Sequence, residues 1–280
     1  MRLIADSGST STDWHLITSD GQVEEYNTIG LNPYFVSQAE LEKAVESELN
    51  SKFDFGAVDE VFFYGAGCSS DEKCAQVEAG LSSLFSNAKI EVNHDLMGAA
   101  RAALGKKSGI VAILGTGSNS ALYNGQEIVK NIPSLGFILG DEGSGAHMGK
   151  KLLKAYMAGK LSDAISQKLK GEYDLSRENI LDSLYSQPRP NTYLASFAKF
   201  VGVNRADSQI DKIARSSINN FFERYICQYQ GHEKQTLGFA GSIAHHFSDI
   251  INDIANEKGI ELGKIVVKPI GELVKYHRYK

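Results

Sequence analysis

Two stretches, Asp6-Ser-Gly-Ser-Thr-Ser-Thr12 and Leu114-Gly-Thr-Gly-Ser-Asn-Ser120, decide the fold that we expect for this chain of 280 residues. Each lies between two short runs of strand character, as the Gly/Ser turn of a β-hairpin does. Thr10 and Thr116 take matching places in the two turns and are 106 residues apart (116 − 10). The chain is therefore expected to contain a repeated structural unit.

The segments around the two turns predict the same order of elements twice, namely three strands, helix, strand, helix, strand, helix. Ser37-x-x-Glu40 and Ser69-x-x-Glu72 read as capping boxes that open two of the helices. The predicted strands are 3–5, 13–17, 23–28, 58–63, 89–92, 110–114, 120–123, 127–131, 236–240 and 265–267. The predicted helices are 37–50, 69–83, 95–104, 143–157, 210–225, 243–255 and 271–277.

This order predicts an α/β protein with two lobes, each a βββαβαβα unit. We place the first lobe at 1–108 and the second at 109–269, with a helical insertion over 159–235 in the second. The last helix, 270–280, is expected to pack back on the first lobe. Ligands of such folds bind where loops converge at the carboxyl ends of strands, so we expect a cleft between the lobes.

Composition narrows the functional classes. The chain has 29 Lys and Arg against 34 Asp and Glu, a net charge of −5, which argues against a nucleic-acid partner. No apolar run is long enough for a membrane span, and the first residues lack the core of a signal peptide. The odd number of cysteines, Cys68, Cys74 and Cys227, fits a reducing compartment. We expect a soluble cytoplasmic protein that binds neither nucleic acid nor membrane.

The 27 glycines concentrate where backbone could approach a ligand. Besides the two hairpin turns, Gly238-Phe-Ala-Gly-Ser242 combines small residues just before a predicted helix. Clustered N–H groups with Ser and Thr hydroxyls can hold phosphate without fixed positive charge, although each segment read alone is equally a plain turn. There is no Walker A sequence, no G-x-S-x-G elbow, and no G-x-G-x-x-G after the first strand.

The three glycine segments together resemble those of the actin/sugar-kinase superfamily. Leu114 to Ser120 and Leu139-Gly-Asp-Glu-Gly-Ser-Gly145 resemble, more closely, N-acetylglucosamine kinases of the BadF/BadG/BcrA/BcrD ATPase family. The resemblance implies an actin-like ATPase fold of two ribonuclease H-like lobes and the use of ATP and Mg²⁺. It implies that Gly241 and Ser242 lie near the adenosine. The residues it implies at the ATP phosphates are Asp6, Gly8, Ser9, Thr10, Thr12, Gly115, Thr116 and Gly117.

Three acids have a chemical role in this interpretation, because phosphorylating a hydroxyl needs charge neutralisation and a proton acceptor. The resemblance implies that Asp95 is the general base, whereas the residues alone allow it to be a helix N-cap. Asp141 is implied to hydrogen-bond sugar hydroxyls, with N-capping again the alternative. Asp6 is implied to hold Mg²⁺ through water, or else it caps the hairpin turn.

The substrate implied by the resemblance is an N-acetylated amino sugar such as N-acetylglucosamine or N-acetylmuramic acid. Asn32, Ser118 and Gly136 map to the sugar pocket, and Asn32 before Pro33 also suits a simple turn. Two other functions stay open: a BadF-type ATPase that activates a partner protein as an iron–sulfur dimer, and a sugar sensor without catalysis. The cysteine spacing shows no cluster pattern. The resemblance leaves a homodimer open.

Overall fold

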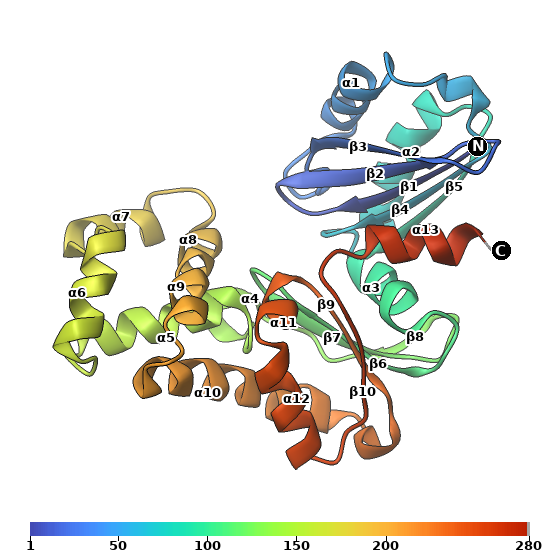
Figure 1. Cartoon of the computed structure of the whole chain (residues 1–280). Helices are drawn as coiled ribbons and strands as arrows, with labels where there is room; N and C mark the ends of the chain where they lie inside the picture. The colour runs from blue at the N-terminus through green and yellow to red at the C-terminus, as the bar shows by residue number, and fades with distance from the viewer. Residues whose placement is uncertain (279–280) are drawn as a thin grey trace. The chain divides into compact units, whose positions relative to one another are not determined.

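The structure is a computed structural model that describes residues 1–278. The chain divides into two compact units (Figure 1): unit 1 holds Met1–Lys106 and the chain from Lys268 onward, and unit 2 holds Lys107–Val267. Positions 279 and 280 of the last predicted helix lie outside the described residues. Within the described chain, no helix is long and apolar enough to cross a membrane.

Unit 1 is a five-stranded sheet in the order β3-β2-β1-β4-β5, in which β1 pairs antiparallel with β2 and parallel with β4. Its strands are β1 (Arg2–Ser7), β2 (Ser11–Ile17), β3 (Val23–Ile29), β4 (Glu60–Gly65) and β5 (Lys89–His94). Its helices are α1 (Gln38–Leu49), α2 (Asp71–Leu84), α3 (Asp95–Leu104) and α13 (Ile270–Arg278), with a 3₁₀ turn at Phe55–Ala57. Helices α1 and α2 cover one face of the sheet, and α3 and α13 pack together on the other (Figure 1).

Unit 2 repeats this sheet in the order β10-β9-β6-β7-β8. Its strands are β6 (Gly109–Leu114), β7 (Ser118–Tyr123), β8 (Ile128–Asn131), β9 (Leu237–Ala240) and β10 (Leu262–Val266). Its helices are α4 (Gly136–Leu139), α5 (Gly145–Met157), α6 (Asp163–Glu172), α7 (Arg177–Tyr185), α8 (Pro190–Ser196), α9 (Ala198–Val203), α10 (Ser208–Arg224), α11 (Ser242–His246) and α12 (Ser248–Glu257), with 3₁₀ turns at Ile226–Gln228 and His232–Lys234. Helices α6 to α9 extend to one side of this sheet in Figure 1.

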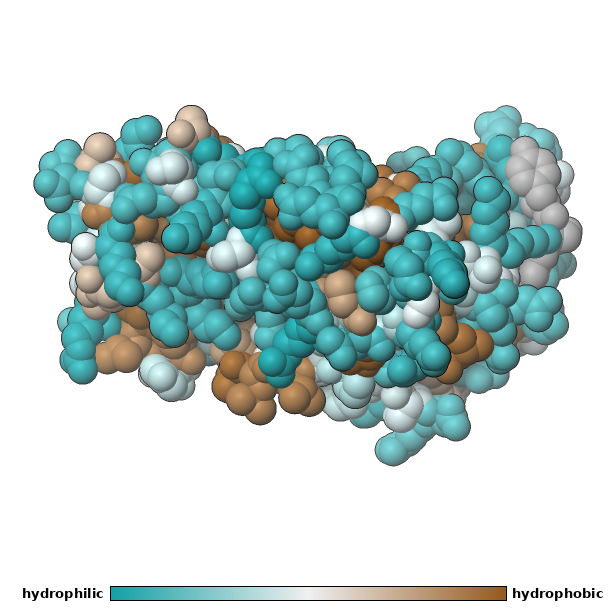
Figure 2. Space-filling model, turned by 90° about the horizontal axis from the view of Figure 1, so that it is seen from below, coloured by the Kyte–Doolittle hydropathy of each residue, from teal (hydrophilic) through white to brown (hydrophobic). Residues whose placement is uncertain are grey.

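Each unit has its own apolar core. In unit 1, buried residues of β1, β2 and β4 such as Leu3, Trp14 and Phe63 pack against α1 and α2. In unit 2, buried residues of β6 and β9 pack with the apolar side of α10, which includes Ile218 and Phe221. Figure 2 shows hydrophilic residues over most of the face that it draws, as expected when the apolar residues gather in such cores.

Four local predictions differ from the structure. The capping box at Ser69 and Glu72 is wrong, because Ser70 caps α2 by accepting from Lys73 N, whereas the box at Ser37 is confirmed. The single predicted helix 243–255 is two helices, α11 and α12, which meet at the buried Phe247. Helix α5 begins at Gly145 and not at 143, since Ser144 is its cap. The short helix α4 was not predicted.

Candidate functional site

The first glycine turn joins β1 to β2 in unit 1. Gly8 N donates to Ser11 O over 2.9 Å, and Thr10 O accepts from Gly30 N over 2.9 Å. A Cβ on Gly30 would lie 2.4 Å from the carbonyl carbon of Ser9, so only glycine fits beneath the turn. Thr12, predicted at the phosphates, is instead buried and shares a hydrogen bond of 2.8 Å with Ser7 Oγ. The exposed part of the turn is therefore Gly8 to Ser11.

Asn32 holds this turn through a hydrogen bond to Ser9. Its Nδ2 donates to Ser9 Oγ over 2.9 Å, and its Oδ1 accepts from Tyr34 N over 3.0 Å. A Cβ on Gly67 would lie 2.1 Å from Asn32 Oδ1, so the amide is enclosed as well as bonded. The turn-forming role allowed by the sequence is thus present.

Three carboxyl groups lie close together beside the turn. Burial, together with the charges of Asp13 and Asp95, raises the pKa of Asp6 to about 7, against the opposing effect of Lys268. Lys268 Nζ lies 2.8 Å from Asp13 Oδ2. Lys268 follows Asp13 by 255 residues and is the residue at which the chain returns to unit 1. The sequence analysis missed this ion pair because no local pattern indicates it. Asp6 therefore lies close enough to Asp13 and Asp95 for their negative charges to raise its pKa.

Asp95 is the first residue of α3, but it does not cap that helix. The cap is His94, whose Nδ1 accepts from Met97 N over 3.2 Å. Asp95 Oδ1 accepts from Leu96 N over 2.8 Å, and burial raises the pKa of the carboxyl to about 6 although backbone hydrogen bonds from Leu96 and from Asp95 itself lower it. A half-buried carboxyl with this pKa, freed from capping, can accept a proton near neutral pH.

The second glycine turn, in unit 2, links three segments far apart in sequence. Gly115 O accepts from Gly145 N over 2.9 Å and Thr116 O accepts from Ala146 N over 3.1 Å, which joins the turn to the start of α5. Gly241 has a φ of +112°, and a Cβ there would lie 2.3 Å from Leu114 O. The Gly238 to Ser242 segment therefore touches the Gly115 turn, and only glycine permits the contact.

Asp141 is held in place by the same turn. Its Oδ1 accepts from Ser118 N over 3.2 Å and from Ser134 Oγ over 2.7 Å, and a Cβ on Gly117 would meet its Oδ2 at 3.0 Å. Asp141 also has a φ of +58°, a left-handed conformation that is uncommon outside glycine and clusters at functional sites. The carboxylate is buried, yet it does not cap α5, a task that Ser144 performs.

Ser118 Oγ is a buried hydroxyl with no hydrogen-bond partner among the described residues. Such atoms are rare in native proteins, and they require an explanation such as a bound ligand. The hydroxyl belongs to the residue whose N–H binds Asp141, so the two groups mark one polar position in unit 2. Gly136, also predicted here, opens α4 with a φ of +71° and has open space where a Cβ would stand.

A pocket of about 630 Å³ lies beside Ser242 in unit 2. Its walls come from α11 on one side and from α8 and α9 on the other, and they include Ile243, Phe247 and Val203 with Lys199 and His246 at polar positions. An apolar slot with a few polar groups is typical of a site for a flat organic ring. The resemblance implied that Gly241 and Ser242 lie near the adenosine, and the joint lining of this pocket by α9 and α11 cannot be read from local spacing.

Glu142 and Cys68 are polar groups outside the two glycine turns, and their surroundings indicate structural roles. Glu142 accepts from Tyr225 Oη over 2.8 Å and pairs with Arg224 at 3.3 Å, which ties it to α10. Burial raises the pKa of the Cys68 thiol to about 12, which disfavours the thiolate that a metal cluster needs. In residues 1–278, no group of three or more His, Cys, Asp or Glu could hold a metal ion.

Comparisons with known proteins give the family and the fold of this chain. The sequence profile of the BadF/BadG/BcrA/BcrD ATPase family matches residues 5–274. The chain belongs to this family. A solved structure from Porphyromonas gingivalis, named as a candidate N-acetylglucosamine kinase, is 34% identical over 100% of this chain and 99% of its own, with a TM-score of 0.94. No curated protein matches the chain by sequence.

More distant structures show the fold that this family member shares. A candidate N-acetylglucosamine kinase from Chromobacterium violaceum has a TM-score of 0.74 at 14% identity and covers 98% of both chains. A glucokinase of the ROK family from Streptomyces griseus, solved with glucose and AMPPNP, has a TM-score of 0.56 at 12% identity over 99% of this chain and 98% of its own. The fold is therefore that of the actin-like sugar kinases, with two α/β lobes, as the resemblance implied.

Proposed function

We propose that this protein transfers the γ-phosphoryl group of ATP to a hydroxyl of an N-acetylated amino sugar. The observation that carries the proposal is Asp95, a half-buried carboxyl with a pKa of about 6 that His94 releases from helix capping. Family membership and the relative from Porphyromonas gingivalis support the kinase activity and the class of sugar. We expect the protein to act on a free small molecule.

For ATP, unit 2 offers both a ring pocket and a phosphate turn. The apolar pocket next to Ser242 would take the adenine, and Gly241 connects it to the Gly115 turn. The exposed Thr116 of that turn, and Thr10 and Ser9 in unit 1, would bind phosphate oxygens. Backbone N–H groups and hydroxyls let an acidic protein do this without a basic cluster.

Mg²⁺ fits the carboxyl group of Asp6. The raised pKa of Asp6 shows that its negative charge lacks compensation, and a divalent cation would supply it. Mg²⁺ keeps several waters and needs few protein ligands, so the lack of a larger cluster in the described chain is compatible with such a site. When bound, the ion would neutralise phosphate charge.

In the transfer step, the sugar hydroxyl oxygen forms a bond to the γ-phosphorus while the bond from that phosphorus to the β–γ bridging oxygen breaks. ADP leaves, and Asp95 accepts the hydroxyl proton. Asp141 and Ser118 in unit 2, and the amide of Asn32 in unit 1, would orient the sugar through its hydroxyl or acetamido groups.

The test is ADP release, coupled to a spectroscopic readout, across amino sugars with and without an N-acetyl group and across plain hexoses. We expect turnover with at least one N-acetylated sugar and far slower ADP release without sugar. Turnover of plain hexoses alone would overturn the substrate class. ADP release that no sugar accelerates would favour the ATPase alternative over the kinase.

A further inference from the structure

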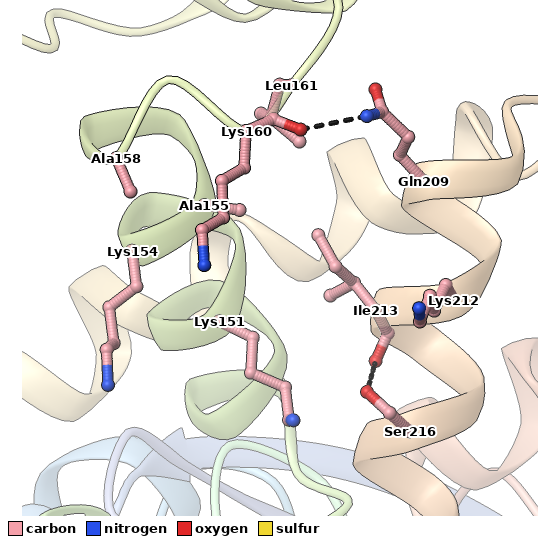
Figure 3. Close-up of a pocket in the computed structure, with 10 residues that line it drawn as sticks. All are labelled: Lys151, Lys154, Ala155, Ala158, Lys160, Leu161, Gln209, Lys212, Ile213 and Ser216. Carbon is pink, nitrogen blue, oxygen red and sulfur yellow. Dashed lines mark hydrogen bonds between the residues drawn. The ribbon is translucent and has the colours of Figure 1, made fainter.

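A second pocket, of about 570 Å³, lies in unit 2 among helices to which the proposed function gives no role. Figure 3 shows Lys151 and Lys154 of α5, with Lys160 just beyond the helix, on one side and Lys212 of α10 on the other. Gln209 bridges the sides, since its Nε2 donates to Lys160 O over 2.8 Å. Four lysine residues thus line one hollow in a protein of net charge −5; Lys151 is half-buried, and Lys154, Lys160 and Lys212 are exposed.

These four lysines lack the acidic partners that cationic side chains usually have. Within the described chain, none of them forms an ion pair, and the nearby Asp211 of α10 is held by Arg205 and Arg215 at 3.1 and 2.9 Å. Lys150 differs, because its Nζ donates to Phe137 O over 2.8 Å. Burial and the charges of Lys154 and Lys150 lower the pKa of Lys151, and a bound anion would favour the charged form of this lysine.

Helix stabilisation does not explain the arrangement. Lys154 lies in the last turn of α5, where a cation is favourable to the helix dipole. Lys212, however, is the fifth residue of α10 (Ser208–Arg224), near the end where the dipole disfavours positive charge. The helix dipole therefore does not account for Lys212 on the wall opposite the other three lysines.

We propose that this pocket, called here the lysine pocket, binds a small molecule that carries two phosphate groups. A phosphate monoester carries nearly two negative charges at neutral pH, so two of them match four ammonium groups. Ala155, Leu161 and Ile213 supply an apolar floor for the organic part of the ligand. The volume is in the usual range for small-molecule sites.

The test locates binding by lysine labelling. Reductive methylation of the wild-type chain, read by mass spectrometry at fixed ionic strength, is compared with and without fructose 1,6-bisphosphate as the probe. We expect labelling of Lys151 and Lys212 to slow at least about threefold, and labelling of the exposed Lys168 and Lys170 on α6 to stay constant. If the probe protects Lys168 and Lys170 as much as Lys151 and Lys212, or protects none of these lysines, the proposal is overturned.

Affinity provides the second measurement, by calorimetry on the full chain. Lys151→Gln with Lys212→Gln should weaken binding of fructose 1,6-bisphosphate at least about tenfold, and Lys168→Gln with Lys170→Gln, the same change in net charge, less than about twofold. Glycerol 3-phosphate, with one phosphate, should bind at least about tenfold more weakly than the bisphosphate. Equal losses in both double variants, or equal affinity for the two probes, contradict a built bisphosphate site.

Discussion

Asp95→Asn removes the proposed base and keeps the size of its side chain. The amide cannot accept a hydroxyl proton, so kcat should fall by about 10²–10⁴-fold, the usual contribution of a general base. The fold around it should persist, because His94 caps α3 and an amide oxygen can still accept from Leu96 N. We therefore expect the KM for ATP to change by less than about threefold.

The raised pKa of Asp95 also predicts the shape of the pH profile. A carboxyl whose pKa burial raises to about 6 is mostly protonated at pH 5 and cannot then act as a base. The ionised fraction is about 9% at pH 5, about half at pH 6 and about 97% at pH 7.5. The wild-type kcat should accordingly rise about fivefold from pH 5 to 6 and about twofold more by pH 7.5, whereas the residual rate of Asp95→Asn should not follow this limb.

The assay is coupled ADP release at saturating amino sugar, with Asp71→Asn as the matched control. Asp71 is exposed and lies in the first turn of α2, as Asp95 does in α3, so the control removes a similar helix-dipole contribution. It should retain at least about half of the activity. If Asp95→Asn keeps more than about a tenth of the wild-type rate, or keeps the acidic limb, Asp95 is not the base.

Three further changes test other parts of the site. Gly241→Ala puts a methyl group 2.3 Å from a carbonyl oxygen and should lower the melting temperature by at least about 5 °C, whereas Gly271→Ala, with open space, should change it by less than about 2 °C. Because the folded Asp6 carboxyl (pKa about 7) holds its proton where the unfolded one (3.8) has lost it, wild-type stability should fall as pH rises from 4 to 7. Asp6→Asn should lose the part of this fall that Asp6 contributes, at most about 4 kcal/mol in urea unfolding, and should keep the part that the raised pKa of Asp95 contributes. Ser118→Ala removes an unpaired hydroxyl, so it should raise the KM for the sugar at least about tenfold without loss of stability. Ser120→Ala breaks a buried hydrogen bond of 2.9 Å to Tyr229, so it should lower the free energy of unfolding by about 1 kcal/mol and leave the KM unchanged. A Ser118 variant with an unchanged KM would remove that residue from the proposed sugar site.

Local sequence patterns predicted much of the fold. The hairpin turns were readable because Gly and Ser adopt turn geometry through short-range sterics, and the Ser37 capping box depends on residues three apart. The break between α11 and α12 could not be predicted, because the apolar pattern over 243–255 continues across it. Only the structure shows that α11 ends at the buried Phe247. The sequence left open whether Asp95 caps α3, because Asp95 and His94 are adjacent and only the backbone path decides which of them is the cap.

The sequence by itself determined the repeated order of elements and the glycine turns, because these depend on residue type and on spacing along the chain. Only the tertiary structure decided that Lys268 pairs with Asp13, that Gly241 touches the hairpin turn, and that Ser118 has a buried hydroxyl without a partner. These contacts join residues brought together by packing, and burial then alters the pKa of a group such as Asp95. At Gly241 the missing side chain is what allows two segments to meet.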